Sequence, residues 1–223
     1  MIEYRILLDE ASGSGELRFE IDPARASSST GDNLPEWTAL DYHKCATCPL
    51  AAEEHPRCPA AVDVAPILEA FKDAVSFHRA EVHVRTPERE FVKNCDLQSA
   101  LQALLGLVMA TSGCPLLRRL RPMAVHHLPF ANREETTFRA VAAYLLQQYF
   151  VARDGGEPDL ELGGLKDLYL DLQEVNRSLT DRIRAAARKD ANLNAVAILF
   201  TLSVLVSASL DDELASLRAL FEG

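Results

Sequence analysis

The hydrophobic pattern of the chain changes its period once, near Asp96, and this change limits the folds that the chain can adopt. Before it, apolar and polar residues alternate in segments 2–8, 16–21, 80–85 and 90–93. Turn residues at 13–15 and 86–88 join these segments in pairs, which predicts two β-hairpins. After Asp96, apolar residues recur with the period of α-helices. The sequence therefore predicts an α+β fold: N-terminal β-hairpins with a cysteine-rich metal loop, followed by a C-terminal helical bundle.

A chain of 223 residues is long enough to bury a sizeable core. We expect a single domain over residues 1–223, with a strand-rich and metal-loop part at 1–95 and a helical part at 96–223. A short helix is expected to begin near Pro66, because proline is tolerated in the first turn of a helix. Gly113 is expected to end the first long helix as its left-handed residue. Asn132 and Glu135 have the spacing of a helix-capping box.

The expected apolar faces of the later helices follow from residues three or four positions apart. They consist of Phe138, Val141, Leu145 and Tyr149 in one helix and of Leu165, Leu168, Leu172, Val175, Leu179 and Ile183 in the next. Residues 195–210 are apolar on nearly every side but fall short of the roughly twenty residues of a membrane span. We expect a helix in the centre of the bundle, or partly in a homodimer interface, and a short closing helix with Leu214, Leu217 and Phe221.

Charge and cysteine content limit the surroundings in which the chain can work. The formal net charge of −10 opposes binding to nucleic acid and to anionic membranes. The odd number of cysteines, five, and an N-terminus without a signal-peptide pattern argue against a secreted disulfide framework. We therefore expect a cytoplasmic protein, with no nucleic-acid and no membrane partner.

Three cysteines lie in one short polar stretch, with Cys45 and Cys48 three positions apart and Cys58 further along. Thiolates at this first spacing can reach one zinc ion or iron-sulfur cluster from a single turn. Cys114 is our first choice for the fourth ligand. Carbonyl groups at a helix C-terminus would destabilise a bare thiolate there, and a cation would reverse that effect. The alternatives for the fourth ligand are Cys95, His43, His55, His126 and His127.

The sequence leaves the metal open between zinc and a 4Fe-4S cluster. Proline follows Cys48, Cys58 and Cys114, as in some ferredoxin motifs, but the remaining spacing matches no ferredoxin run. We favour a zinc ion, which with four protein ligands would be structural because no coordination position stays open. A redox dithiol of Cys45 and Cys48 is a further alternative, and Cys95 and Cys114 could instead be buried free thiols.

A second candidate site lies between Cys114 and Arg139, where several arginines flank two adjacent histidines. Guanidinium groups bind carboxylates and phosphates through paired hydrogen bonds. Since adjacent side chains diverge in extended backbone, only one of the two histidines is expected to face a ligand. The candidate residues for binding a small anionic ligand are His127, Arg118, Arg121 and Arg133. The alternative is that the arginines are simply solvated.

Several short motifs occur together in the chain: Cys45-x-x-Cys48-Pro49-Leu50, Cys58-Pro59, Ser112-Gly113-Cys114-Pro115, Arg121-Pro122-Met123 and His127-Leu128-Pro129-Phe130. With this combination, residues 40–200 resemble an uncharacterised bacterial family, a domain of unknown function with CxxCPL, CP, SGCP and HLPF motifs. The resemblance implies that the four cysteines Cys45, Cys48, Cys58 and Cys114 belong to the family pattern together with His127. It implies no activity.

These observations favour a binding or regulatory protein whose four-cysteine metal site ties the strand-rich part to the helical part. The alternatives are an iron-sulfur redox protein, or an enzyme acting on a small anionic substrate near His127, Arg118 and Arg121. The enzyme alternative is weakened because the sequence has no serine-histidine-aspartate motif, phosphate-binding glycine loop or dinucleotide fingerprint. The expected partners are a small anionic ligand and a second copy of the chain.

Overall fold

A four-stranded antiparallel sheet forms the N-terminal part of the fold in the computed structural model, which describes residues 1–9, 15–24, 34–186, 189–212 and 214–221. The strands are β1 (Ile2–Leu8), β2 (Gly15–Ile21), β3 (Arg79–Arg85) and β4 (Glu90–Asp96), in the order β2-β1-β3-β4. Both predicted hairpins are confirmed, and pairing of β1 with β3 joins them into one sheet. Residues 13–14 of the first predicted turn and most of the predicted loop at 24–35 lie outside the described residues.

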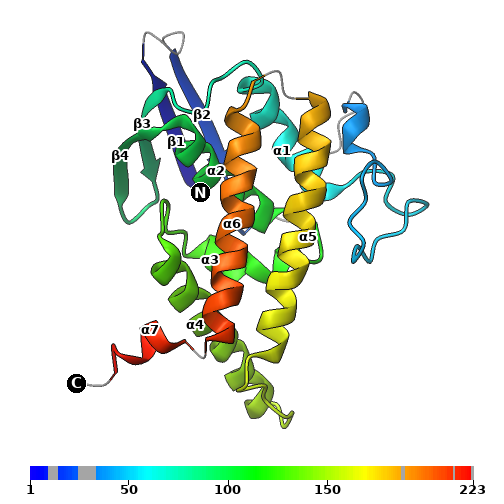
Figure 1. Ribbon diagram of the computed structural model, residues 1–223, viewed down its shortest axis with the longest axis vertical. Helices are drawn as coiled ribbons and strands as arrows, with labels where there is room; N and C mark the ends of the chain where they lie inside the picture. Colours follow the sequence, from blue (N-terminus) through cyan, green and yellow to red (C-terminus); the bar gives the residue numbers. More distant parts are fainter. Residues whose placement is uncertain (10–14, 25–33, 187–188, 213, 222–223) are drawn as a thin grey trace.

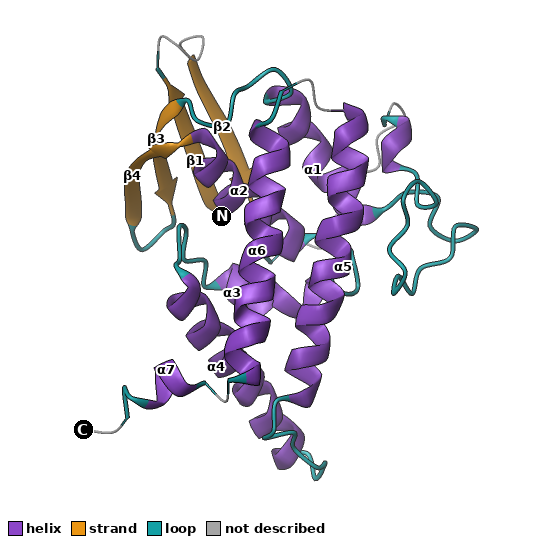
Figure 2. Cartoon of the chain, in the orientation of Figure 1, coloured by secondary structure: helices purple, strands orange, loops and turns teal. Residues whose placement is uncertain are grey.

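The two faces of the sheet differ in chemistry. Tyr4 and Ile6 of β1 and Val82 of β3 are fully buried on the face that the helices cover (Figure 2). On the opposite face, Glu16 accepts a hydrogen bond of 2.9 Å from Arg5, and His83 forms ion pairs with neighbouring glutamates. The alternation that predicts the strands therefore also decides which side carries the core.

Seven α-helices and two short 3₁₀-helices lie in the described residues, most of them after the sheet. They are η2 (Glu36–Thr38), α1 (Pro59–Ala70), α2 (Leu97–Thr111), η3 (Leu117–Leu120), α3 (Arg121–Val125), α4 (Arg133–Arg153), α5 (Gly163–Ala186), α6 (Ala191–Asp211) and α7 (Ala215–Arg218). Helices α5 and α6 lie side by side along the long axis of the molecule, and α6 also packs on α2 (Figure 1). The fold class is α+β, as predicted.

The central helix is α2 rather than α6. It contacts the sheet through β3 and β4 and also contacts α1, α3 and α6, and most of its apolar side chains are buried. By contrast, only 28% of the most apolar stretch of α6 is buried. By length and composition alone α6 could cross a membrane, with a mean hydropathy of 2.1, although core helices of soluble proteins meet the same criterion. The predicted absence of a membrane partner stays a prediction.

Two local expectations were wrong: the start of helix α1 and the left-handed conformation of Gly113. Helix α1 begins at Pro59, directly after the N-cap residue Cys58, so that Pro66 lies inside the helix on its exposed side. Helix α2 ends at Thr111 with Ser112 as its C-cap in an extended conformation, and Gly113 does not have a positive φ. Helix α1 thus has Pro59 in its first turn, where proline is tolerated, and a second proline, Pro66, at an exposed position inside the helix.

The predicted faces of the two long helices had different outcomes. All six apolar residues predicted to share the face of α5 are buried. In α4, the capping box of Asn132 and Glu135 is confirmed, but of the four predicted face residues only Val141 is buried. Phe138 and Tyr149 are about half exposed, at 47% and 53%. Periodicity detected the helix but not the side on which the rest of the chain packs.

Candidate functional site

The cysteine-rich segment is a loop whose two ends are held together by backbone hydrogen bonds. Cys58 N–H donates to the Thr38 carbonyl at 2.8 Å, and Leu40 N–H donates to the Pro56 carbonyl at 3.0 Å. Within the loop, Cys48 N–H donates to the Cys45 carbonyl at 3.1 Å, which closes a tight turn. The first two cysteines of the predicted site therefore lie on one turn, and the third lies at the closed neck of the loop.

Helix α5 anchors this loop through buried polar side chains. Arg182 is 2% exposed and donates hydrogen bonds of 2.8, 2.6 and 2.8 Å to the carbonyls of Trp37, Ala39 and Leu40. One turn earlier, the Ser178 hydroxyl donates to the His43 carbonyl. The loop thus lies against α5 although more than a hundred residues separate the two in the chain.

The fourth cysteine reaches the same place from a third segment. Cys114 is buried just after α2, and the backbone N–H groups of Leu116 and Leu117 lie beside its sulfur atom. The sulfur-bearing residues Cys45, Cys48, Cys58 and Cys114 all line one cavity of about 20 Å³, together with Ser178 and Arg182 of α5. We call this the four-cysteine cavity. Cys95 lies elsewhere, buried on β4 opposite Ala80.

Burial controls the protonation of these thiols. It raises the pKa of Cys114 to about 11 and also raises the pKa of Cys45, where the positive charge of Arg182 acts in the opposite direction. Both groups are therefore uncharged thiols at neutral pH unless a cation stabilises the thiolate. As the side chains stand, no group of three or more histidine, cysteine, aspartate or glutamate residues among those described is arranged to hold a metal ion.

The four residues predicted to bind an anion do not surround one cavity. Arg118 lines a cavity of about 340 Å³ between η3 and α4. Arg121 donates hydrogen bonds to the carbonyls of Pro23 and Ala24, and Arg133 is exposed at the start of α4. His127 lines a different cavity, of about 150 Å³.

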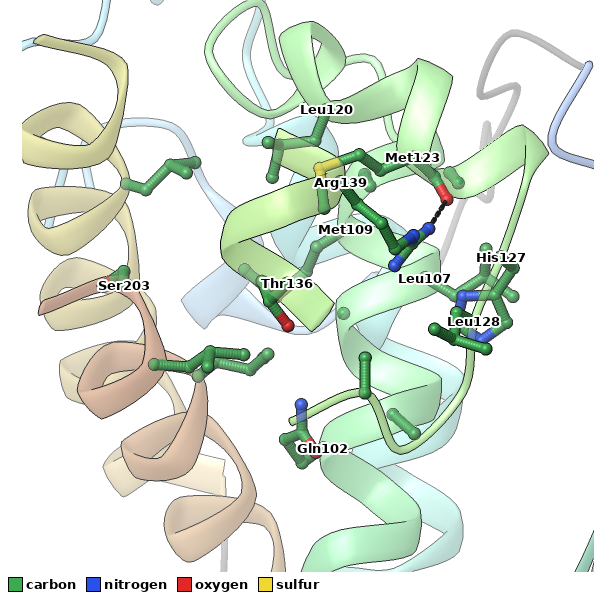
Figure 3. A pocket seen from close by; sticks show the side chains of 18 of the residues that line it. Gln102, Leu107, Met109, Leu120, Met123, His127, Leu128, Thr136, Arg139 and Ser203 are labelled. Carbon is green, nitrogen blue, oxygen red and sulfur yellow. Dashed lines mark hydrogen bonds between the residues drawn. The ribbon is translucent and has the colours of Figure 1, made fainter. Parts of the chain in front are cut away.

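That second cavity also contains an arginine that the sequence did not single out. Arg139 of α4 lines it and donates a hydrogen bond of 2.7 Å to the carbonyl of Met123 (Figure 3). A second hydrogen bond of 2.7 Å goes from Arg139 to the carbonyl of His126. His127 Nε2 lies 2.6 Å from the Tyr4 hydroxyl. Burial, followed by the charge of Arg139, lowers the pKa of His127 to about 4, so that the imidazole is neutral at pH 7. A neutral imidazole nitrogen can accept a hydrogen bond from the Tyr4 hydroxyl.

Arg182 was not among the site residues predicted from the sequence, although its position in the sequence indicates a buried role. It lies three positions after Leu179 and next to Ile183, on the buried face of α5. An arginine on an apolar helix face is unusual enough to indicate a buried hydrogen-bonding role. For Arg139 no comparable signal exists, because most residues of the apolar face predicted for α4 are exposed in the structure.

The architecture defines an α+β protein in which a small antiparallel sheet and a helical bundle share one core, with a cysteine-lined cavity at the edge of the bundle. The chain belongs to the family described as domain of unknown function DUF6901, whose model matches residues 2–222. This match includes the N-terminal hairpin, which lies outside the motif resemblance. No curated protein and no solved structure matches the chain significantly.

Proposed function

We propose that the protein binds one metal ion, zinc, through Cys45, Cys48, Cys58 and Cys114, and that the ion fastens the cysteine-rich loop to the helices of a binding or regulatory protein. The observation that carries this proposal is the convergence of four thiols from three separate segments on one cavity. A free cysteine usually packs as a small buried apolar residue, and packing alone does not explain why four of them line one cavity. Because the described side chains are not arranged to hold an ion, the four sulfur atoms would have to turn towards a common centre when the metal binds.

Charge balance around the cavity supports a thiolate site. The guanidinium of Arg182 lines the cavity, is almost fully buried and has no carboxylate partner in the described part of the chain. Its hydrogen bonds go to three neutral carbonyls, which do not cancel its charge. A zinc ion bound by four thiolates carries a net negative charge and would supply the missing counter-charge.

The local backbone would also stabilise thiolates. Cys58 is the N-cap of α1, where the helix dipole favours negative charge. The N–H groups beside the Cys114 sulfur act in the same direction and lower its pKa, against the larger effect of burial. These contacts are the kind of outer interactions that orient and tune metal ligands.

The size of the cavity favours a single ion over a cluster. A cavity needs about 10–15 Å³ to hold one water molecule, so the four-cysteine cavity, at about 20 Å³, has room for one small ion. A 4Fe-4S cluster, with its cube of iron and sulfide, would require the loop to move away from α5. Zinc in a closed tetrathiolate site is structural, so that any ligand or partner would be bound elsewhere on the protein.

Elemental analysis of anaerobically purified protein tests the proposal. We expect one zinc ion per chain and no visible absorbance. Cys58→Ser should remove most of the zinc and lower the melting temperature, because metal binding is linked to folding. Cys95→Ser is the control: this cysteine is buried on β4 and does not line the cavity, so that zinc content should stay at one per chain.

Three results would contradict the proposal. Metal-free wild type with an unchanged melting curve in Cys58→Ser would exclude a metal role for the cysteines. Equal loss of zinc in Cys58→Ser and Cys95→Ser would place the ion elsewhere. A brown protein with stoichiometric iron and sulfide would select the electron-transfer alternative instead of zinc.

A further inference from the structure

The cavity that Arg139 shares with His127 has the features of a binding pocket for a small organic molecule. We call it the Arg139 pocket. It lies where α2, α3, α4, α5 and α6 meet and has a volume of about 150 Å³ (Figure 3). Its walls are mostly apolar, with Leu107, Met109, Leu128 and Leu199 among the lining residues. Apolar walls with a few polar groups are typical of small-molecule sites.

Arg139 gives the pocket a positive charge that the protein does not neutralise. In the described part of the chain it forms no ion pair. The charge of Glu135 acts on Arg139, but the Glu135 carboxylate accepts the backbone N–H of Asn132 at 2.8 Å in the capping box. Only Nη2 of Arg139 donates within the protein, to two carbonyls, so that the N–H groups of Nε and Nη1 have no partner among the described residues.

Two further polar groups in the pocket also lack partners. Tyr169 and Asn176 of α5 both line the cavity, and they are only 4% and 5% exposed. Neither the Tyr169 hydroxyl nor the Asn176 amide forms a hydrogen bond with a described residue, and their polar atoms are not fully closed off, since among the described residues Asn192 Oδ1 is the fully buried side-chain atom that lacks a partner. Polar groups that line a cavity and have no partner in the protein are available to bond to a ligand or to water there. Tyr169 lies near enough to Arg139 for the guanidinium charge to act on its phenol group, although burial raises the pKa of Tyr169 and keeps it uncharged.

We propose that the Arg139 pocket binds a small monocarboxylate with an apolar body, its carboxylate on Arg139 and Tyr169 and its body among the leucine and methionine side chains. An apolar cavity of about 150 Å³ is known to accommodate a molecule of the size of benzene. Benzoate therefore represents the ligand class in size and charge. This inference goes beyond the metal site and does not depend on it, since none of the four cysteines lines the pocket.

The charge of the pocket favours a monoanion over a phosphate. The other ionisable side chains that line the pocket, His127 and Tyr169, are both uncharged at pH 7, because burial lowers the pKa of His127 and raises the pKa of Tyr169, so that the pocket lining carries the one positive charge of Arg139. A phosphate dianion would bring more charge than one guanidinium compensates, and it would leave the apolar walls without contact.

Calorimetric titration of the full chain, with its metal retained, tests this proposal. We expect saturable binding of benzoate to wild type, and binding of benzamide, a neutral molecule of nearly the same shape, that is weaker by about tenfold or more. Arg139→Gln should weaken benzoate binding by about tenfold or more. Arg153→Gln, on an exposed arginine of the same helix, is the matched control and should leave benzoate binding unchanged.

Tyr169→Phe keeps the test decisive if Arg139→Gln fails to fold, since Arg139 also holds two backbone carbonyls. The Tyr169 hydroxyl has no partner within the described protein, so its removal should leave the melting temperature without ligand unchanged or slightly higher. Benzoate affinity should nevertheless fall several-fold. No saturable binding of benzoate to wild type, equal affinity for benzoate and benzamide, or equal affinity in wild type and Tyr169→Phe would each overturn the proposal.

Discussion

Arg139 and Arg182 carry two buried or half-buried guanidinium groups whose hydrogen bonds go to backbone carbonyls and not to carboxylates. Desolvating a charge in this way costs free energy unless an opposite charge lies nearby. Each of the two arginines lines a different cavity, and at each cavity the proposed occupant is negatively charged: a metal tetrathiolate at Arg182 and a carboxylate at Arg139. At each site a single arginine thus favours a negatively charged occupant.

His127 should make the stability of the protein depend on pH. Its pKa is lowered to about 4 in the folded state, chiefly by burial, against an ordinary value near 6.5. The unfolded chain therefore binds more protons between these two values, and stability falls as the pH is lowered from 7 towards 4. We expect His127→Gln, which keeps a partner for Tyr4, to reduce this loss by up to about 3 kcal/mol.

Urea unfolding at a series of pH values between 7 and 4.5 measures this effect. His126→Gln is the control, because this histidine is adjacent in sequence but exposed, and its variant should follow the wild-type curve. Parallel pH profiles for wild type and His127→Gln would show that the imidazole does not titrate in the expected range.

In helix α4, local sequence specifies where the helix begins but not which of its sides packs against the rest of the protein. Its N-terminus has a complete capping box, in which Asn132 Oδ1 accepts Glu135 N–H at 2.9 Å and Glu135 accepts Asn132 N–H at 2.8 Å. Its middle leaves Leu146 and Phe150 more than half exposed, at 56% and 55%. Caps depend on residues three positions apart, whereas burial depends on which neighbours are present.

Removal of the cap should destabilise the protein without changing either proposed site. Asn132→Ala is expected to lower the free energy of unfolding by about 1 kcal/mol, because the backbone N–H of Glu135 loses its acceptor. Asn132→Ser restores an acceptor at the same position and should recover most of this loss. Equal stability of wild type and Asn132→Ala in urea unfolding would mean that the cap contributes nothing to the folded state.

At the scale of the whole molecule, one core extends from Ile2 in the sheet to Leu210 in α6. The cysteine-rich loop adds few side chains to this core and is attached mainly through polar contacts with α5 and through the proposed metal ion. The loop should therefore be the part of the described chain that depends most on the metal. The expected homodimer and the cytoplasmic location stay predictions.

Removal of the metal by a chelator should loosen this loop first. We expect faster amide hydrogen exchange in residues 41–58 and 112–117, together with a melting temperature lower by several degrees. Exchange in the paired strands β1 and β3 should stay slow, which provides the internal control. If chelation accelerated exchange uniformly, or changed nothing in the loop, the ion would not act as a local fastening.

Much of the architecture could be predicted because it rests on contacts between near neighbours in the chain. The two hairpins, the face of α5 from Leu165 to Ile183 and the capping box of α4 all follow from spacings within one element. The start of α1 was misplaced because two prolines, Pro59 and Pro66, can each stand in the first turn of a helix. Gly113 follows the C-cap of α2 as expected but does not have the left-handed conformation.

The sequence by itself determined the strands and most of the helices, and it grouped Cys45, Cys48 and Cys58, since periodicity, caps and short spacings are local properties; Cys114 was one of several candidates for the fourth position. Only the tertiary structure decided that these cysteines line one cavity beside Arg182, and that His127 shares a pocket with Arg139 and not with Arg118, Arg121 or Arg133. The reason is physical: which residues become neighbours depends on how α2, α4 and α5 pack, and packing is determined by the whole core at once.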